Sequence, residues 1–176
     1  MATLHIDDGR RRVLKAGAGL GVVALATGLT SATTRTGSDR LKLGLVGCGG
    51  RGTGAIINAL RADAGTDLWA LADVFPDRIT SCLSHATNAV QDDPNRIQVT
   101  DDRRFVGFEA YQRLIESGVD VLLLCTPPCF RPEQLRAAVE AGKHVFCEKP
   151  VAVDAPGVRS VLESARLAED KNLSLM

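Results

Sequence analysis

The most constraining feature of the chain is a glycine-rich turn between an apolar segment and an amphipathic one. The turn reads Gly47-Cys48-Gly49-Gly50-Arg51-Gly52 and matches the spacing G-x-G-x-x-G. Residues 41–46 before it are continuously apolar apart from one lysine and predict a strand, whereas residues 53–61 after it carry a helical apolar stripe. In such a turn the first glycine permits a tight bend, the second lets the backbone approach a ligand, and the third lets helix and strand pack closely.

This turn predicts a binding site for the pyrophosphate of a dinucleotide, because free N–H groups and the helix dipole favour anions at a helix N-terminus. Asp73 ends the next predicted strand, a little beyond the roughly 20 residues at which an acidic residue is expected to bind the adenosine ribose. Its charge would repel a 2′-phosphate and so favours NAD over NADP. Arg51 fits either the pyrophosphate or a 2′-phosphate, which keeps NADP open. The alternatives are an ordinary tight turn and, for Asp73, a simple turn residue.

Strands and helices alternate along the rest of the chain. Further strands are predicted at residues 67–73, 97–100, 119–125, 144–147 and 173–176, and helices at 76–90, 108–115, 132–139 and 154–170. On the helices at 108–115 and 154–170 we expect inward-facing stripes that include Phe108 in the first and Val158 and Leu162 in the second. Six strands with this spacing predict a doubly wound, parallel α/β Rossmann sheet in three layers, formed by residues 38–176.

Two further loops are expected at the edge where these strands end, which is where open parallel sheets bind ligands. Thr126-Pro127-Pro128 follows the fourth predicted strand, and Glu148-Lys149-Pro150 follows the fifth. A lysine beside a nicotinamide ring is partly desolvated, which suits proton transfer. The alternatives are an ordinary loop and a surface lysine.

The segments LKLGLVGCGGRG, ALADVFPDR, VLLLCTPP and AGKHVFCEKPVA together resemble the Gfo/Idh/MocA family of nicotinamide-dependent oxidoreductases. The resemblance covers residues 40–176, the N-terminal domain of that family. It implies NAD as cofactor, with NADP possible, and hydride transfer to or from a sugar or polyol substrate. It further implies that Lys149 is catalytic or orients substrate and also belongs to the cofactor-binding residues, that Glu148 lies by the nicotinamide ribose, and that Thr126 and Pro127 line the cofactor site.

The chain also departs from the family pattern. Pro128 and Arg131 stand where many members have asparagine and histidine. The family's second α/β domain, which holds substrate, is absent from the sequence, so we expect the chain to be truncated before that domain and incomplete for catalysis. A homo-oligomer is expected only if that domain exists. An NAD-dependent glycosidase without net redox change and a non-catalytic dinucleotide-binding module are the two alternative functions.

Composition narrows the choice of partners. The 21 basic residues are matched by 21 acidic ones, so the formal net charge of zero gives no support to nucleic-acid binding. The five cysteines include no Cys-x-x-Cys pair, so we expect no metal site and interpret most of them as small buried side chains.

The first 37 residues differ from the rest and are interpreted as a signal and linker. Arg10, Arg11 and Arg12 precede an uncharged, glycine- and alanine-rich stretch at 16–29. This arrangement resembles a twin-arginine export signal and predicts a periplasmic or cell-envelope location. The apolar run is shorter than the roughly 20 residues of a stable membrane span. A basic amphipathic helix is the alternative.

Overall fold

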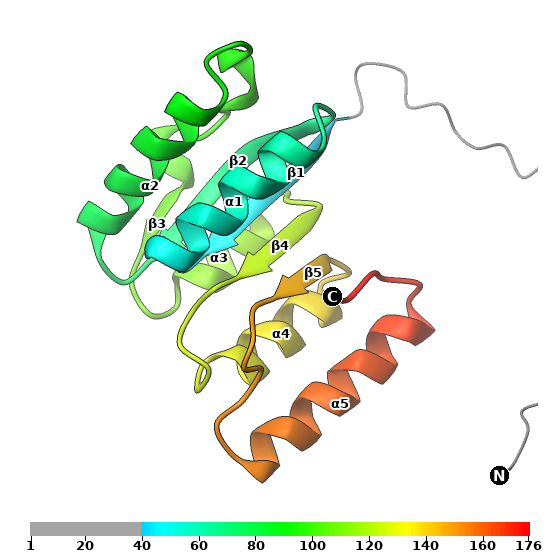
Figure 1. Ribbon diagram of the computed structural model, residues 1–176. Coiled ribbons are helices and arrows are strands. Elements are labelled where there is room, and N and C mark those ends of the chain that lie inside the picture. The colour runs from blue at the N-terminus through cyan, green and yellow to red at the C-terminus, as the bar shows by residue number, and fades with distance from the viewer. Residues whose placement is uncertain (1–39) are drawn as a thin grey trace, which may run out of the picture. The chain divides into compact units, whose positions relative to one another are not determined.

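The computed structural model describes residues 40–176, which form a parallel sheet with helices on both faces (Figure 1). The expected export signal lies outside the described residues. The strands are β1 (Leu41–Val46), β2 (Thr66–Asp73), β3 (Arg104–Val106), β4 (Val121–Leu124) and β5 (His144–Cys147). The helices are α1 (Gly50–Ala62), α2 (Pro76–Ala89), α3 (Ala110–Glu116), α4 (Arg131–Glu140) and α5 (Ala155–Asp170). The strand order β3-β2-β1-β4-β5 is that of the doubly wound fold and confirms the predicted fold class.

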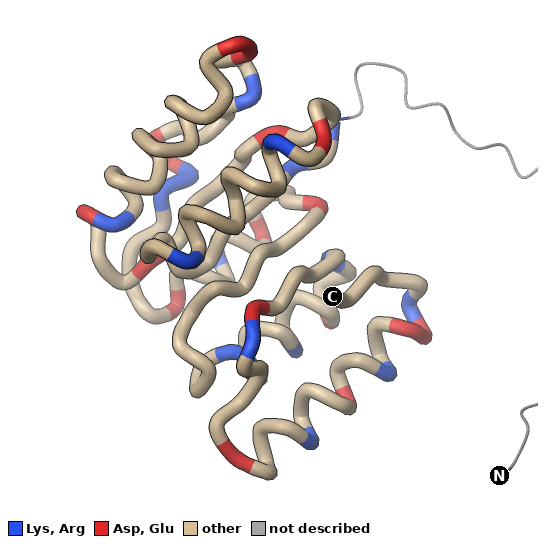
Figure 2. The backbone as a smooth tube through the Cα atoms, viewed as in Figure 1, with Lys and Arg blue, Asp and Glu red and all other residues tan. Residues whose placement is uncertain are grey.

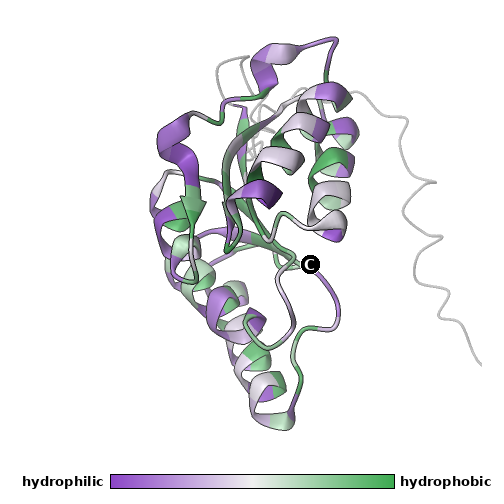
Figure 3. Cartoon of the chain, turned by 90° about the vertical axis from the view of Figure 1, so that its left-hand side faces the viewer, coloured by the Kyte–Doolittle hydropathy of each residue, from purple (hydrophilic) through white to green (hydrophobic). Residues whose placement is uncertain are grey.

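The sheet separates two hydrophobic clusters, because successive side chains of a strand point to opposite faces. On one face Leu45 and Leu123 pack with Ile56 and Leu60 of α1 and with α2. On the other, the strand residues pack with α3, α4 and α5. Figure 3 shows the mainly hydrophobic strands between the helical layers. The change of face between α1 and α3 leaves a crevice at the carboxyl ends of β1 and β4, the switch point of such a sheet.

Of the six predicted strands, the third is wrong as a strand and the sixth is only begun. Residues 97–100 make only an isolated bridge, from Ile97 to Leu68, and the ladder to β2 resumes at β3. Strand β3 lies at the sheet edge and is partly exposed, so its sequence does not need to be apolar. The third strand was therefore predicted at residues 97–100, where the sequence does carry an apolar pattern. At the other edge, residues 174–176 run parallel to β5 and exchange three backbone hydrogen bonds with Val145 and Cys147, so a sixth strand begins there, although only one bridge, between Val145 and Leu175, is formed.

Three expected inward-facing residues are exposed. Phe108 lies in the loop before α3 and is 65% exposed, and Val158 and Leu162 point outward from α5. Helix α5 instead buries Ser164 and Ala168, which are small enough to pack closely against its neighbours. Its start was predicted correctly, since the Asp154 side chain caps it by accepting a hydrogen bond from the Gly157 amide.

Basic and acidic residues are interspersed along the described part of the chain, and no region of it carries charges of only one sign (Figure 2). No helix within residues 40–176 is long and apolar enough to cross a membrane. In the same part of the chain, no three histidine, cysteine or acidic side chains gather in a way that could hold a metal ion.

Candidate functional site

The glycine-rich turn joins β1 to α1, and each of its three motif glycines meets a different spatial demand. Gly47 has a φ of +94°, which side chains rarely permit. A Cβ on Gly52 would overlap the carbonyl oxygen of Gly47, so only glycine lets α1 pack this closely on the turn. A Cβ on Gly49 would have only the Arg78 guanidinium within reach, at 3.8 Å, and would otherwise project into open space. The second glycine therefore leaves room for a ligand.

Helix α1 starts on this turn with the amide of Thr53 donating to the carbonyl of Gly49, at 2.8 Å. The amides of Gly50, Arg51 and Gly52 precede that first helical bond, and amides in this position have no partner within a helix. Neither the N-cap residue nor the first turn places an acidic side chain over them. Backbone donors and open space thus coincide at the turn, and the arrangement fits the pyrophosphate of a dinucleotide.

Asp73 lies at the end of β2 and faces the same turn. Its Oδ2 accepts a hydrogen bond of 2.7 Å from the amide of Cys48, and its Oδ1 accepts one of 2.9 Å from the amide of Phe75. The carboxylate is therefore held by the backbone on both oxygens, and each oxygen keeps a further lone pair for a ligand hydroxyl. Asp73 is therefore the turn residue that the sequence offered as one alternative, and its remaining lone pairs are compatible with the other alternative, a ligand for the ribose.

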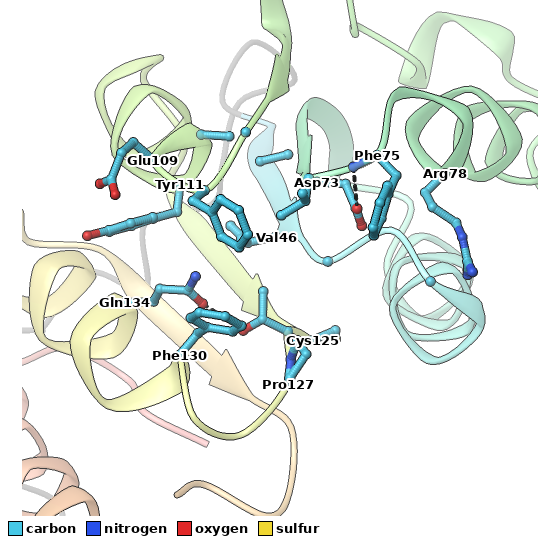
Figure 4. Close-up of a pocket in the computed structure, with 18 of the residues that line it drawn as sticks. Val46, Asp73, Phe75, Arg78, Glu109, Tyr111, Cys125, Pro127, Phe130 and Gln134 are labelled. Carbon is cyan, nitrogen blue, oxygen red and sulfur yellow. Dashed lines mark hydrogen bonds between the residues drawn. The ribbon is translucent and has the colours of Figure 1, made fainter.

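A cavity of about 680 Å³ opens at this edge of the sheet (Figure 4). Asp73, Phe75 and Arg78 line one side, and Tyr111, Phe130 and Gln134 line the other (Figure 4). Five of the predicted site residues belong to its lining, namely Gly47, Gly49, Asp73, Thr126 and Pro127. The cavity follows the switch-point crevice, and aromatic side chains line both of its sides.

The remaining predicted residues lie outside this lining. The Cys48 side chain is buried in the core, and only its amide faces the site. Gly50 and Gly52 belong to the first turn of α1. Arg51, Glu148 and Lys149 lie further along the same edge, at α1 and after β5.

Several lining residues were missed by sequence reasoning, among them Phe75, Arg78, Phe108, Tyr111, Phe130 and Gln134. Phe108 and Phe130 come from different loops, yet their rings lie 6.0 Å apart between centroids. Arg78 is the one residue with a visible sequence signal, since it is a cation in the first turn of the helix that follows Asp73. The others come together only through the fold.

The loop after β4 is tied to the loop after β5 by Arg131, which is buried. Its Nε donates to the carbonyl of Thr126 at 2.7 Å, and its Nη1 donates to the carbonyls of Glu148 and Pro150. The Thr126 hydroxyl donates to Oε1 of Gln134 at 2.6 Å. Arg131, which stands where many family members have histidine, therefore connects the two loops through its guanidinium group.

Glu148 connects this edge to the glycine-rich turn. Its Oε2 accepts from Nε of Arg51 at 2.7 Å and forms an ion pair with Nη2 at 2.5 Å. The Arg51 hydrogen bond lowers the pKa of Glu148, so the carboxylate is charged. Lys149 is exposed, and its peptide bond to Pro150 is cis. Arg51 thus contacts a protein carboxylate in this structure rather than projecting freely toward a ligand phosphate.

The cysteines near the site are held as thiols. Burial raises the pKa of Cys125 to about 11 and also raises that of Cys147. Cys48 and Cys82 are fully buried in one cluster, Cys125 and Cys147 are half-buried and Cys129 is exposed, so fewer cysteines are buried than expected.

Comparison with known proteins places this site among dinucleotide-binding domains. Residues 41–175 match the family described as an oxidoreductase family with an NAD-binding Rossmann fold. Inositol 2-dehydrogenase of Paracoccus denitrificans is 31% identical over 130 residues, which are 73% of this chain and 34% of that protein. A glycosyl hydrolase family 109 protein of Shewanella pealeana is 25% identical over 139 residues, 78% of this chain and 28% of that protein.

Solved structures share the fold. An NAD-binding oxidoreductase from Klebsiella pneumoniae superimposes with a TM-score of 0.56 at 28% identity, over 78% of this chain and 34% of that one. The chain spans about a third of the length of the curated relatives it matches.

Proposed function

Because the chain belongs to the Gfo/Idh/MocA oxidoreductase family, with an NAD-binding Rossmann fold, we propose that it supplies the cofactor half of an enzyme that oxidises or reduces a sugar or cyclic polyol. The observation that carries the proposal is the cavity at the carboxyl edge of the sheet. It combines the open glycine-rich turn with the Asp73 carboxylate. The inositol 2-dehydrogenases among the relatives support the substrate class.

The cofactor would lie across the sheet edge with its adenosine half over β2 and its pyrophosphate at the start of α1. Asp73 would accept the ribose hydroxyls, and Thr126 and Pro127 would line the path toward β5. When bound, the nicotinamide accepts or donates a hydride. Lys149 would hold or move the proton of the substrate hydroxyl, a role that suits an amine at the edge of a partly desolvated site.

The proposal is tested by titrating the full chain with NAD, NADH and NADP and recording binding by calorimetry. We expect NAD to bind, and NADP to bind more weakly because of the Asp73 charge. Lys149→Ala should leave NAD affinity unchanged, since the lysine serves the substrate rather than the cofactor. In the natural protein the same variant should lose dehydrogenase activity toward inositols. Failure of the wild-type chain to bind any nicotinamide dinucleotide would refute the proposal.

A second candidate is an NAD-dependent glycosidase, supported by the similarity to the glycosyl hydrolase family 109 protein. Such an enzyme would release a leaving group from a nitrophenyl glycoside without accumulating NADH. A dehydrogenase would instead accumulate NADH when mixed with a free polyol. Measuring both signals in one assay separates the two functions, and a chain that binds NAD with neither signal would be a binding module.

We also propose that the chain is exported through the twin-arginine route, on the basis of Arg10, Arg11 and the apolar stretch at 16–29. Export of a folded protein would let the cofactor be loaded before transport. Replacing both arginines with lysine should retain the protein inside the cell, as measured by fractionation. Equal distribution of the wild-type and double variant would count against this route. Homo-oligomers are proposed only for a protein that includes the family's second domain.

A further inference from the structure

The strand order places Asp73 and Glu148 on opposite sides of β1, and Arg51 lies in the turn that follows β1. Asp73 lies after β2, on one side of β1, and Glu148 lies after β5, on the other side. If Asp73 binds the adenosine ribose, the second ribose of the dinucleotide lies over β4 and β5. Arg51 is the residue of the pyrophosphate turn that reaches Glu148, across 97 positions of sequence.

The geometry of the ion pair leaves half of Glu148 available. Both contacts of Arg51, from Nε and Nη2, are made to Oε2. The Glu148 side chain is only 8% exposed, so its charge depends on this partner, whereas the Arg51 side chain is 56% exposed. Oε1 accepts no hydrogen bond from Arg51, so a ligand hydroxyl can donate to it. Meanwhile Arg131 holds the backbone carbonyl of Glu148 from the opposite side.

We propose that Arg51 is a positioning residue: it does not bind the pyrophosphate but holds Glu148 so that the free carboxylate oxygen receives a hydroxyl of the nicotinamide ribose. This rests on the proposed function, since it requires a dinucleotide at the sheet edge. The glycine-rich turn then binds phosphate through its amides alone, and its arginine serves the distant half of the cofactor. The ion pair persists when the cofactor is bound.

Three ligands distinguish this role from direct phosphate binding. ADP contains the adenosine and the pyrophosphate, ADP-ribose adds the second ribose, and NAD adds the nicotinamide. The dissociation constants of all three are measured by calorimetry on the full chain and on Arg51→Gln, Glu148→Gln and the double variant. Arg136→Gln is the matched control, because it breaks an arginine–glutamate pair on the surface of α4. Arg51→Lys keeps the charge but loses the two-nitrogen contact, and it covers the case in which the neutral variant folds poorly.

We expect Arg51→Gln and Glu148→Gln each to weaken NAD and ADP-ribose by about fivefold to tenfold while ADP changes by less than about twofold. The double variant should be no weaker than either single variant, because both act through one carboxylate oxygen. Arg51→Lys should weaken the binding of the same two ligands, NAD and ADP-ribose, by a smaller factor.

If Arg51→Gln weakened the binding of all three ligands equally, Arg51 would bind the pyrophosphate directly. That result would overturn this inference but not the proposed function. So would unchanged affinity for all three, or additive losses in the double variant. A wild-type chain that binds none of the ligands would overturn the proposed function, and the inference would fall with it.

Discussion

The amide of Cys48 donates a hydrogen bond of 2.7 Å to Oδ2 of Asp73, which joins the glycine-rich turn to the end of β2. The second oxygen of the same carboxylate accepts from Phe75. One side chain therefore shapes two loops that line the cavity and also carries the charge expected to select the cofactor. A change at this position should affect loop geometry and cofactor choice together.

Asp73→Asn tests this double role. The amide cannot accept on both sides and carries no charge, so we expect NAD to bind about tenfold more weakly, as when a charge-assisted hydrogen bond is lost. NADP should be affected less, so the preference for NAD should shrink. Calorimetric titration with both cofactors measures the ratio, and Asp92→Asn, in an exposed turn after α2, is the control. An unchanged ratio would contradict the assigned role of the charge.

Gly52→Ala tests the close contact between α1 and the turn. The added methyl group would overlap the carbonyl oxygen of Gly47, so the variant should lose about 1–3 kcal/mol of unfolding free energy. Gly54→Ala is the control in the same helix, because its Cβ would meet nothing within 4 Å. It should gain about 0.5–1 kcal/mol from helix propensity. Urea unfolding followed by circular dichroism compares the two, and similar midpoints would disprove the packing argument.

Arg131→Met tests the connection between the loops after β4 and β5. The variant removes the donor of three backbone carbonyls, so we expect a loss of at least about 2 kcal/mol in unfolding free energy. Arg136→Met breaks exposed ion pairs with Glu140 and Glu163 and should cost less than about 1 kcal/mol. Both values come from denaturant unfolding. Equal losses would mean that Arg131 contributes no more than a surface arginine.

The Arg51–Glu148 ion pair should make stability depend on pH. Arg51 lowers the pKa of Glu148 below its ordinary value of 4.5, so the folded state holds the charged carboxylate more strongly than the unfolded chain does. This contribution is complete above pH 4.5 and is lost as the pH falls through the lowered folded-state pKa. Arg51→Gln should therefore flatten the acid limb of a plot of unfolding free energy against pH. Coincident slopes for wild type and variant would argue against the pair.

Local sequence patterns were sufficient for most of the fold. The apolar strands β1, β2 and β4, and the helix starts at Pro76 and Asp154, were predictable because hydrophobic periodicity and capping act within a few residues. The edge strand β3 was not, since a strand with one neighbour and partial exposure carries no strong apolar signal. Phe108 and the outer residues of α5 were misassigned because periodicity does not reveal which apolar face finds a partner.

The sequence by itself determined the glycine-rich turn, the acidic residue after β2 and the Glu148-Lys149-Pro150 loop, because these are contiguous motifs whose backbone demands are local. Only the tertiary structure decided that Arg51 contacts Glu148, that Arg131 spans two loops, and that Phe75 and Phe130 face one cavity. The two members of each pair lie in different connections between strands. Their distances depend on strand order and on which face each helix covers, and neither property is encoded in any short stretch of the chain.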